Sequence, residues 1–534
     1  MMPPVELEIS GMTCSDCAEH VRAALERAGA EVLAVDWRAG RAQIAEGGPD
    51  AAALERALAS TRYRLERVLE PIRSGAEDPA RGTREFDLVV LGSGSAAFAA
   101  AIRARDLGAR VLMVERGIIG GTCVNVGCVP SKSLLASSER LDGHPGALAE
   151  ALARKGELVS RLRQAKYIDL IEEYGIELRT GEGRLADPHA VTVDGETISA
   201  DAILIATGAR PAVPPISGLE RTGYLTSTTA LEVTEPPHRL AVVGANAVGL
   251  ELGQMFGNFG ARVTFIDLLR VAPFEEPEIS EAIRAVLQQA GHAVLEGATV
   301  TRVCTEGAGK LLEGTAAGEP FRIEADELLI ATSRTPNTEG LGLAEVGVET
   351  DARGAVLVDQ YQRSSVPSIY AAGDVTNQPQ FVYVAAAAGA AAAQNALGDG
   401  DRATLDFSNL PRIIFTRPQI AAAGLTEQQA RERGFEVDIS VLPLEAIPRA
   451  LVNGDARGLF KLIAERGSRR LLGASIIADS AGEVIQSVVL AIKAGLTIDE
   501  LASTWAPYLT MAEGLKLAAQ TFERDVAKLS CCAA

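Results

Sequence analysis

The sequence lacks an excess of basic residues, a long apolar run and a recognisable leader. Its 534 residues hold 51 Lys and Arg against 70 Asp and Glu, a formal net charge of −19 at pH 7. Nucleic-acid binding and docking on anionic membranes both use basic patches, so this balance argues against both. No run of 18 apolar residues occurs, and the start, MMPPVELEIS, has neither a basic nor an apolar leader region. We therefore expect a cytoplasmic protein with no nucleic-acid partner and no stable membrane insertion.

Histidine and cysteine are also scarce, yet the cysteines are not scattered. There are five His, the last at position 292, and seven Cys. Six of the Cys form pairs, at positions 14 and 17, 123 and 128, and 531 and 532. In a reducing compartment such pairs indicate metal-binding or redox sites rather than a disulfide framework. The seventh, Cys304, has no partner in the sequence, and we expect it to be buried and inert.

The first 70 residues predict a small α+β unit. Alternation over 5–9 predicts a strand, and the helical pattern over 18–28 stops at Gly29. Further strands near 31–36, 41–45 and 63–69, with a helix near 50–60, complete a βαββαβ order. Residues 71–83 are rich in Pro, Gly and charge, which predicts a linker.

The rest of the chain contains one nucleotide-binding pattern twice. Each copy has a buried strand, a Gly-rich turn, a helix and a second strand, and an acidic residue follows 23 positions after the first Gly: Glu115 after Gly92, and Asp267 after Gly244. Glycines let the backbone approach a pyrophosphate at the helix N-terminus, and the acidic residue takes the ribose hydroxyls. The duplication predicts two α/β, Rossmann-like dinucleotide domains.

The second copy departs from the pattern. Asn246 replaces the middle Gly, while Gly249 keeps the third position. Asp267 favours a free 2′-hydroxyl and therefore NADH, whereas Arg262 and Arg270 could serve the 2′-phosphate of NADPH. The sequence leaves both readings open.

Residues 120–132, GGTCVNVGCVPSK, place Cys123 and Cys128 in a Gly-rich segment that opens a helix. A helix N-terminus lowers a thiol pKa, and Lys132, one turn after Cys128, adds positive charge. Gly120 and Gly121 allow close approach to a flat ring. The segment predicts a redox-active cysteine pair beside a flavin, so the first dinucleotide domain is the FAD candidate.

GGTCVNVGCVPSK, the Gly92–Ala97 fingerprint, the ATG-like segments at 203–211 and 328–336 and IYAAGD (369–374) resemble the flavin disulfide reductases, a class I pyridine nucleotide-disulfide oxidoreductase family. The resemblance covers about residues 84–534. It implies a homodimer whose chain runs through an FAD domain (84–232), an NAD(P) domain (233–350), a second FAD segment (351–408) and an α+β dimerisation domain (409–534).

The resemblance also implies roles for single residues. Cys128 would form the thiolate beside the flavin, Cys123 would exchange with substrate, and Lys132 would contact the flavin and pair with Glu251. The implied FAD-binding residues are Gly92, Gly94, Ala97, Glu115, Gly117, Thr122, Lys132, Gly183, Asp374 and Val382, and the implied NAD(P) residues are Gly244, Gly249, Glu251 and Asp267.

The late segment of the chain departs from the members that reduce organic disulfides. Those members protonate the leaving thiolate with a His backed by a Glu. Here Tyr508 stands at the His position, although Glu513 is kept. A Tyr with a pKa of about 10 is a poor proton shuttle at neutral pH. Glutathione reductase and dihydrolipoamide dehydrogenase activities are therefore disfavoured.

A soft metal ion needs thiolates but no proton shuttle, and the adjacent Cys531 and Cys532 suit such an ion. Their Cα atoms are about 3.8 Å apart, below the usual disulfide range of about 4.4–6.8 Å. GMTCSDC (11–17) resembles the metal-capturing loop of heavy-metal-associated domains, which have a ferredoxin-like βαββαβ fold. With NQPQFVYVAAAAG (377–389), PYLTMAEGLKLAAQTF (507–522) and LSCCAA (529–534), the whole resembles the branch of the family that reduces mercuric ion.

This second resemblance implies that NAD(P)H, through FAD, reduces Hg(II) to Hg(0) for mercury detoxification, with NADPH expected and NADH possible. Cys14 and Cys17 would capture Hg(II) from thiol complexes. Cys531 and Cys532 would carry it to Cys123 and Cys128 of the partner subunit.

Tyr167, in RQAKY (163–167), and Tyr508 would flank the ion, although a Tyr in a helix more often packs in a core. Two alternatives stay open. One is a disulfide reductase with a C-terminal dithiol relay, and the other is a non-catalytic soft-metal-binding protein.

Overall fold

The computed structural model describes residues 5–12, 15–37, 40–45, 48–59, 61, 63–69, 82–141, 144, 146–398, 400 and 402–525. Cys14, Cys531, Cys532 and most of the predicted linker lie outside the described residues. In the described part of the chain, no helix has the length and apolar content needed to cross a membrane.

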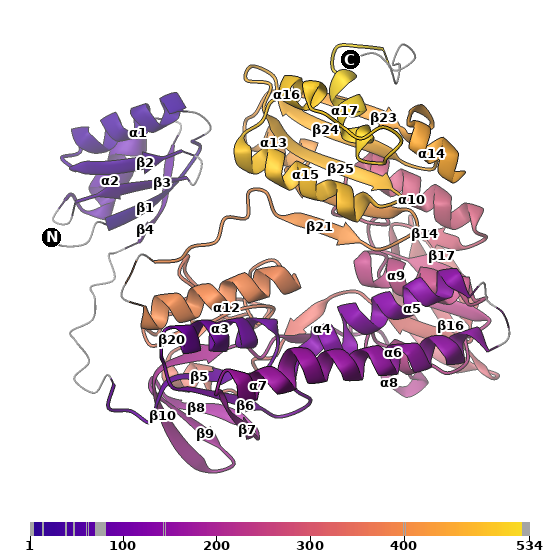
Figure 1. Cartoon of the computed structure of the whole chain (residues 1–534), viewed down its shortest axis with the longest axis horizontal. Coiled ribbons are helices and arrows are strands. Elements are labelled where there is room, and N and C mark those ends of the chain that lie inside the picture. The colour runs from indigo at the N-terminus through magenta and orange to yellow at the C-terminus, as the bar shows by residue number, and fades with distance from the viewer. Residues whose placement is uncertain are drawn as a thin grey trace.

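The N-terminal unit has the element order that the sequence predicts. It consists of β1 (Val5–Ser10), α1 (Ser15–Arg27), β2 (Val32–Asp36), β3 (Arg41–Ile44), α2 (Ala51–Ala59) and β4 (Arg64–Leu69). Its antiparallel sheet has the order β2-β3-β1-β4, and the two helices pack against each other and the sheet (Figure 1). Alternation along β1 buries Leu7 and Ile9 in a core of its own, which also contains Cys17.

The first nucleotide unit is built on a mixed sheet. Its elements are β5 (Phe86–Leu91), α3 (Ser95–Asp106), β6 (Val111–Glu115), α4 (Gly121–Val126), α5 (Cys128–Arg140), α6 (Ala147–Arg163), a π-helix (Gln164–Ile168), α7 (Asp169–Glu173), β7 (Glu177–Thr180), β8 (Gly183–Asp187), β9 (Ala190–Val193) and β10 (Glu196–Ile205). The order is β7-β6-β5-β10-β9-β8, in which β7, β6, β5 and β10 are parallel and β9 and β8 continue as an antiparallel extension. Strand β5 is buried along its length except at Asp87.

A later segment of the chain returns to complete this unit. Strand β20 (Ile369–Ala371) pairs in parallel with β10, and α12 (Val382–Leu397) lies along α3 (Figure 1). Both helices are rich in Ala, and a Cβ at Gly389 would lie 2.0 Å from the carbonyl oxygen of Ala96. Small residues therefore let the two helices approach closely.

The second nucleotide unit repeats the parallel arrangement. Its sheet has the order β14-β13-β12-β18, formed by β12 (Arg239–Val243), α9 (Ala247–Asn258), β13 (Arg262–Ile266), α10 (Pro277–Gln289), β14 (Ala293–Leu295) and β18 (Glu327–Ile330). A second, antiparallel sheet contains β15 (Ala298–Glu306), β16 (Gly309–Ala316) and β17 (Glu319–Ala325). The two ATG-like segments lead into β11 (Ala209–Pro211) and β19 (Arg334–Pro336), which pair with each other and join the two units.

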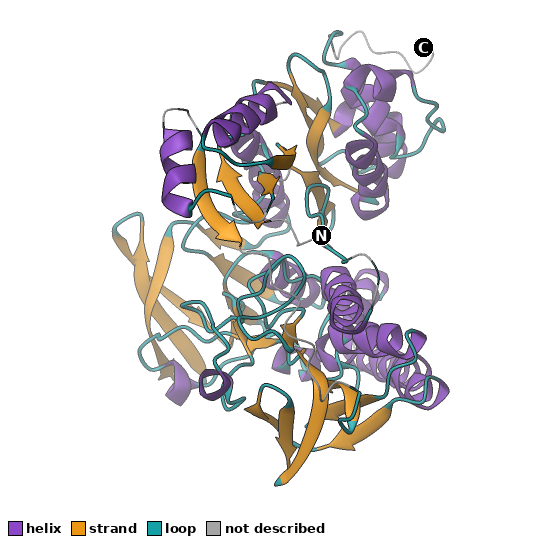
Figure 2. Ribbon diagram, turned by 90° about the vertical axis from the view of Figure 1, so that its left-hand side faces the viewer, coloured by secondary structure: helices purple, strands orange, loops and turns teal. Residues whose placement is uncertain are grey.

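The C-terminal domain is a five-stranded antiparallel sheet with helices packed on it. The sheet has the order β21-β22-β25-β24-β23, and α15 and α17 pack on it (Figure 1). Figure 2 shows helices beside the strands of this domain, near the C-terminal label. The elements are β21 (Pro411–Ile414), β22 (Gln419–Gly424), α13 (Glu427–Glu432), β23 (Val437–Pro443), α14 (Pro448–Asn453), β24 (Leu459–Glu465), β25 (Leu471–Ala478), α15 (Ala481–Ala494), α16 (Ile498–Ser503) and α17 (Glu513–Gln520). Two short helices, α8 (Leu219–Thr222) and α11 (Leu343–Val346), lie in earlier connections.

The expectation that Cys304 is buried is wrong. Cys304 lies on β15 and is half-buried, because side chains alternate along the strand and Val303 takes the inward position. Its β16 neighbour across the sheet is Leu311.

A buried lysine joins the C-terminal domain to the second nucleotide unit. The side chain of Lys461, on β24, is only 1% exposed, and its ammonium lies 3.0 Å from Glu276, 2.9 Å from Glu278 and 2.9 Å from Glu427. Glu276 also accepts a hydrogen bond from the backbone N–H of Glu427, at 2.6 Å. The ammonium therefore compensates carboxylates from both domains.

Replacing Lys461 should destabilise this junction. Lys461→Met leaves three carboxylates near one another without their cation, and the loss of one partner of a buried charge cluster costs about 3–5 kcal/mol. Thermal unfolding of the holoenzyme would measure this loss of stability. The matched control is Arg466→Met, which removes an exposed pair with Asp438 and should cost about 1 kcal/mol or less. Equal effects of the two variants would contradict the structural role of Lys461.

Candidate active site

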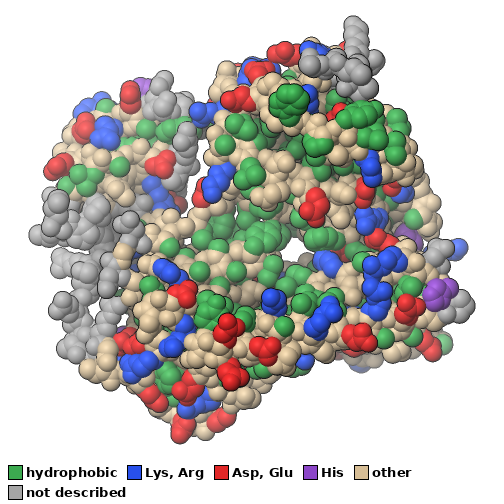
Figure 3. Space-filling model, viewed as in Figure 1, with side chains coloured by type: hydrophobic (Ala, Val, Ile, Leu, Met, Phe, Trp, Pro, Cys, Tyr) green, Lys and Arg blue, Asp and Glu red, His purple; other side chains and the backbone are tan. Residues whose placement is uncertain are grey.

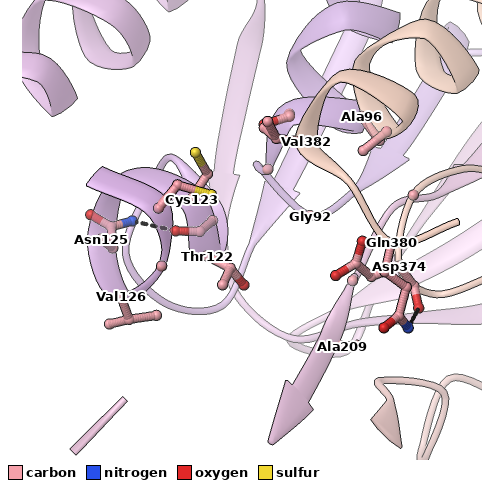
Figure 4. Close-up of a pocket in the computed structure, with 18 of the residues that line it drawn as sticks. Gly92, Ala96, Thr122, Cys123, Asn125, Val126, Ala209, Asp374, Gln380 and Val382 are labelled. Atoms are coloured by element: carbon pink, nitrogen blue, oxygen red, sulfur yellow. Dashed lines mark hydrogen bonds between the residues drawn. The ribbon is translucent and has the colours of Figure 1, made fainter. Parts of the chain in front are cut away.

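A cavity of about 540 Å³ lies at the carboxyl ends of β5, β10 and β20. Its lining includes Gly92, Cys123, Cys128 and Asp374, which come from distant parts of the chain (Figure 4). In the space-filling view, hydrophobic side chains gather around the central hollow between the C-terminal domain and the nucleotide units (Figure 3). The carboxyl edge of a parallel sheet is the usual place for a ligand in this class of fold.

Two glycines keep the floor of the cavity open. Gly92 has φ +112°, and a Cβ there would lie 2.5 Å from the carbonyl oxygen of Ala206. Gly121 has φ +63°, and a Cβ there would lie 2.6 Å from the Cα of Gly94. No other residue fits these positions without displacing backbone, so bare backbone faces the N-terminus of α3, where an anion is favoured.

Glu115 stands at the far end of this turn, between the large cavity and a smaller one of about 230 Å³ that Gly183 also lines. The hydroxyl of Ser93 donates to its Oε2 at 2.6 Å, and the N–H of Gly117 donates to its Oε1 at 2.7 Å. The elongated space, the open helix terminus and the oriented carboxylate fit FAD.

The remaining predicted FAD residues fall into two groups. Gly94, Thr122, Lys132, Asp374 and Val382 line the large cavity. Ala97 and Gly117 do not. Ala97 is fully buried in the core beneath α3, where a small side chain is needed, and Gly117 holds Glu115 through its N–H.

The two central cysteines have different pKa values. Cys128 is the first residue of α5, and its pKa is lowered to about 6, mainly because the Cys123 thiol donates a hydrogen bond to it and further because of Lys132, against the effect of burial. The pKa of Cys123 is raised, first because its proton is held in that hydrogen bond and second by burial. At neutral pH the pair is a thiolate at Cys128 and a thiol at Cys123, the division that the resemblance implies.

Lys132 connects this pair to two other domains. Its ammonium forms the predicted ion pair with Glu251, on α9, and lies 5.0 Å from the ring centroid of Phe415. The second oxygen of Glu251 accepts a hydrogen bond from the backbone N–H of Phe415, at 2.9 Å. Glu251 is buried, so both of its oxygens are satisfied where three domains meet.

Tyr167 lies in the π-helix, and its ring packs near the loop that bears the cysteines. Its ring packs edge-on against Phe98, with centroids 4.8 Å apart, and a Cβ at Gly120 would lie 3.4 Å from its Cγ. Burial raises the pKa of Tyr167, and the charge of Cys123 raises it further. Tyr167 therefore packs in a core, as its residue type predicts, and it is not part of the cavity lining, although it is close enough to Cys123 for the charge of that residue to act on it.

The sequence prediction missed two polar contacts of the site. Asn125 accepts a hydrogen bond from Arg163 Nε at 2.7 Å and donates to the carbonyl of Gly121 at 2.9 Å, so it ties the cysteine loop to the end of α6. Arg334 Nε lies 3.3 Å from a carboxylate oxygen of Asp374. Burial raises the pKa of Asp374, and the charge of Arg334 offsets part of this rise. Asn125 could have been singled out because it lies between the two cysteines in GTCVNVGC. No local pattern indicates that Arg163 is its partner.

The described chain does not bring the second tyrosine to the cavity. Tyr508 is 59% exposed on the C-terminal domain and is not part of the cavity lining. The next residue, Leu509, donates its N–H to the buried Glu513 at 3.2 Å.

The second Gly-rich turn has the expected close packing. Gly244 has φ +102°, and a Cβ on Gly249 would lie 1.8 Å from the carbonyl oxygen of Gly244. Asn246, in the place of the middle Gly, is the N-cap of α9. Asp267 follows β13 directly and accepts a hydrogen bond from the N–H of Ala245 at 2.7 Å.

Comparison with known proteins gives a consistent result. The family model described as pyridine nucleotide-disulphide oxidoreductase matches residues 86–389, and that of its dimerisation domain matches residues 410–519. The chain is 47% identical to a mercuric reductase from Staphylococcus aureus, over 99% of each chain, and 50% identical to one from Streptomyces lividans, over 84% of this chain and 98% of that one. A solved HOCl-induced flavoprotein disulfide reductase from Escherichia coli is 32% identical, with a TM-score of 0.75, over 81% of this chain and 99% of that one.

The pKa difference within the cysteine pair can be tested by alkylation. In the reduced protein, iodoacetamide should modify Cys128 with a pH midpoint near 6, since only the thiolate reacts. Cys123→Ala removes the hydrogen bond that lowers the pKa most, so the midpoint should rise toward 9. Mass spectrometry of the labelled peptide gives the profile. Cys304→Ala, which removes a thiol outside the cavity, should leave the midpoint in place. An unshifted profile in Cys123→Ala would refute the assigned hydrogen bond.

Proposed function

The chain belongs to the pyridine nucleotide-disulphide oxidoreductase family, and we propose that it reduces Hg(II) to Hg(0) with NAD(P)H, through FAD and the Cys123–Cys128 pair. The observation that carries this proposal is the pair itself: a thiolate and a thiol in a cavity whose described lining contains no histidine. Such a site binds a soft cation well but has no ready proton donor for a leaving organic thiolate. The full-length similarity to mercuric reductases supports the same substrate.

The described residues supply binding, orientation and charge. The residues around Gly92, Glu115 and Asp374 would hold FAD, which would supply two-electron transfer between the nicotinamide and the Cys123–Cys128 pair. The hydrogen bond from Cys123, together with the charge of Lys132, keeps Cys128 as a thiolate, and Asn125 fixes the loop that bears Cys123. The overall reaction consumes Hg(II) and NAD(P)H and yields Hg(0), NAD(P)⁺ and one proton.

Hg(II) reaches the pair by thiolate exchange. Cys128 displaces one thiolate from the incoming Hg(II) complex, and Cys123 displaces the other after losing its proton to water. The ion thus always keeps sulfur ligands, and Tyr167, which is close enough to Cys123 to be affected by its charge, would be one flanking residue. Every step before reduction trades one sulfur ligand for another, so no free ion is needed.

Delivery to this site rests on parts of the chain beyond the central domains. Cys531 and Cys532 would carry the ion into the cavity of the partner subunit in a homodimer, with Tyr508 as the second flanking residue. The βαββαβ unit would be a ferredoxin-like heavy-metal-associated domain, whose Cys14 and Cys17 load the ion. Exposed apolar side chains on the C-terminal domain, including Leu451, Leu490 and Trp505, support an interface there.

The second candidate function is a disulfide reductase with a C-terminal dithiol relay. The structural similarity to the Escherichia coli flavoprotein disulfide reductase favours it. Oxidised glutathione or oxidised thioredoxin, supplied without Hg(II), separates the two: rapid NAD(P)H oxidation would support this alternative and oppose the mercury proposal.

The terminal cysteines should be needed for turnover. In Cys531→Ala/Cys532→Ala, Hg(II) held by small thiols must enter without a tethered carrier, and loss of tethering lowers the effective ligand concentration by about 100-fold. We expect a comparable fall in Hg(II)-dependent NAD(P)H oxidation, followed at 340 nm. Cys304→Ala is the matched control and should keep full activity. Undiminished turnover of the tail variant would exclude the relay.

The N-terminal unit should load the ion without being essential for its reduction. Cys14→Ser is the cleaner variant, because Cys17 is buried in the core of the unit and its replacement could disturb folding. Cys14→Ser should lower the number of Hg(II) ions bound at equilibrium by one, while steady-state turnover with excess Hg(II) falls far less than in the tail variant. A turnover loss as large as that of the tail variant would contradict this order.

A further inference from the structure

The nucleotide turn of the second unit presents one fixed carboxylate. Asp267 follows the end of β13, where Ala245 N donates to its Oδ2 at 2.7 Å and Leu269 N donates to its Oδ1 at 2.8 Å. These two bonds set the orientation of the group and leave each oxygen able to accept another hydrogen bond. Asp267 is partly exposed, so a ligand can reach the remaining acceptor sites of its carboxylate. An acidic group at this place in a dinucleotide fold accepts from a free ribose 2′-hydroxyl.

Neither arginine considered from the sequence is placed for a 2′-phosphate. Arg270 turns inward, where its Nε donates to the Ser280 hydroxyl at 3.0 Å and a terminal nitrogen donates to the Glu275 carbonyl at 2.6 Å. Arg262 begins β13 and is therefore about 16 Å from Asp267 along the strand, at the opposite edge of the sheet.

The other basic groups nearby are also engaged or uncharged. Arg284 forms an ion pair with Glu296 at 3.0 Å. His292 packs on Phe265, and burial lowers its pKa, so it is neutral at pH 7. The two residues that follow Asp267 are leucines, 66% and 57% exposed. The accessible surface beside the carboxylate is therefore apolar.

We propose that Asp267 makes NADH the preferred reductant and disfavours NADPH. A 2′-phosphate would bring up to two negative charges to a fixed carboxylate, and none of the described basic side chains considered above is free to compensate them. Like charges held together at a binding surface cost several kcal/mol, which corresponds to about 100-fold in affinity. The inference rests on one part of the proposed function, the use of a pyridine nucleotide. It does not require that the substrate is mercury.

Binding can be measured without turnover. Titration calorimetry of the oxidised holoenzyme with NAD⁺ and with NADP⁺ should give a dissociation constant for NAD⁺ that is about 100-fold lower. Equal affinities, or tighter binding of NADP⁺, would overturn the proposal. Steady-state kcat/KM for NADH and NADPH with Hg(II) should show the same order.

Two variants test the residue itself. Asp267→Ala/Leu268→Arg removes the repulsion and supplies a cation on an exposed position, so the preference should reverse toward NADP⁺. Leu268→Arg alone keeps the hydrogen bonds of Asp267 and should narrow the preference by about tenfold, which tests the idea even if the double variant folds poorly. Glu281→Gln removes an exposed charge from α10 and should leave the ratio of the dissociation constants for NADP⁺ and NAD⁺ unchanged. An unaltered ratio in both arginine variants would refute the role of Asp267.

The outcomes also separate this inference from the proposed function. Selective binding of NAD⁺ by a protein that does not consume Hg(II) would keep the inference and reject mercury reduction. Mercury-dependent oxidation of NADPH that exceeds that of NADH would do the reverse.

Discussion

The ion pair between Lys132 and Glu251 is the interaction on which the site depends. Lys132 belongs to the first nucleotide unit, Glu251 to the second, and Glu251 also accepts the N–H of Phe415 at the start of the C-terminal domain. Glu251 is buried and Lys132 is partly exposed, so breaking the pair strands a buried carboxylate and costs less than a fully buried pair does, which is about 3–5 kcal/mol; the contact still couples the three domains where they meet. The same ammonium helps to lower the pKa of Cys128, while Glu251 opposes it. One contact thus serves both assembly and thiolate chemistry.

Local patterns predicted what local backbone determines. The two Gly-rich turns, the acidic residues 23 positions later and the cysteine segment are each set by a short stretch of chain, and each is found as expected. Ala97 shows the limit of such a pattern: its motif position is right, but the residue serves helix packing rather than the cavity. The misjudged burial of Cys304 arose because alternation in a two-faced strand does not say which face is covered.

Contacts between distant residues could not be predicted. Arg163 reaches Asn125 across 38 positions, and Lys461 reaches Glu276 across 185. Neither has a periodic or motif signal, since each depends on how whole units pack. The π-helix that contains Tyr167 was likewise not predicted, because it is only five residues long and follows directly on α6, and no residue type marks such a widened turn. The sequence also left NADH and NADPH both open for the same reason. The positions of the guanidinium groups of Arg262 and Arg270 relative to Asp267 depend on the folded chain.

The cavity of one chain is only part of the catalytic centre that the proposal requires. Its lining comes from the two nucleotide units and the returning FAD segment, and the C-terminal domain contributes no lining residue among those described. Yet that domain carries Tyr508, matches a dimerisation model and exposes large apolar side chains such as Trp505. Burying such side chains against a second copy would be favourable, and Tyr508 is exposed on the same domain. The redox pair is built within one chain, whereas the second flanking residue and the carrier cysteines of the proposed mechanism would come from a partner subunit.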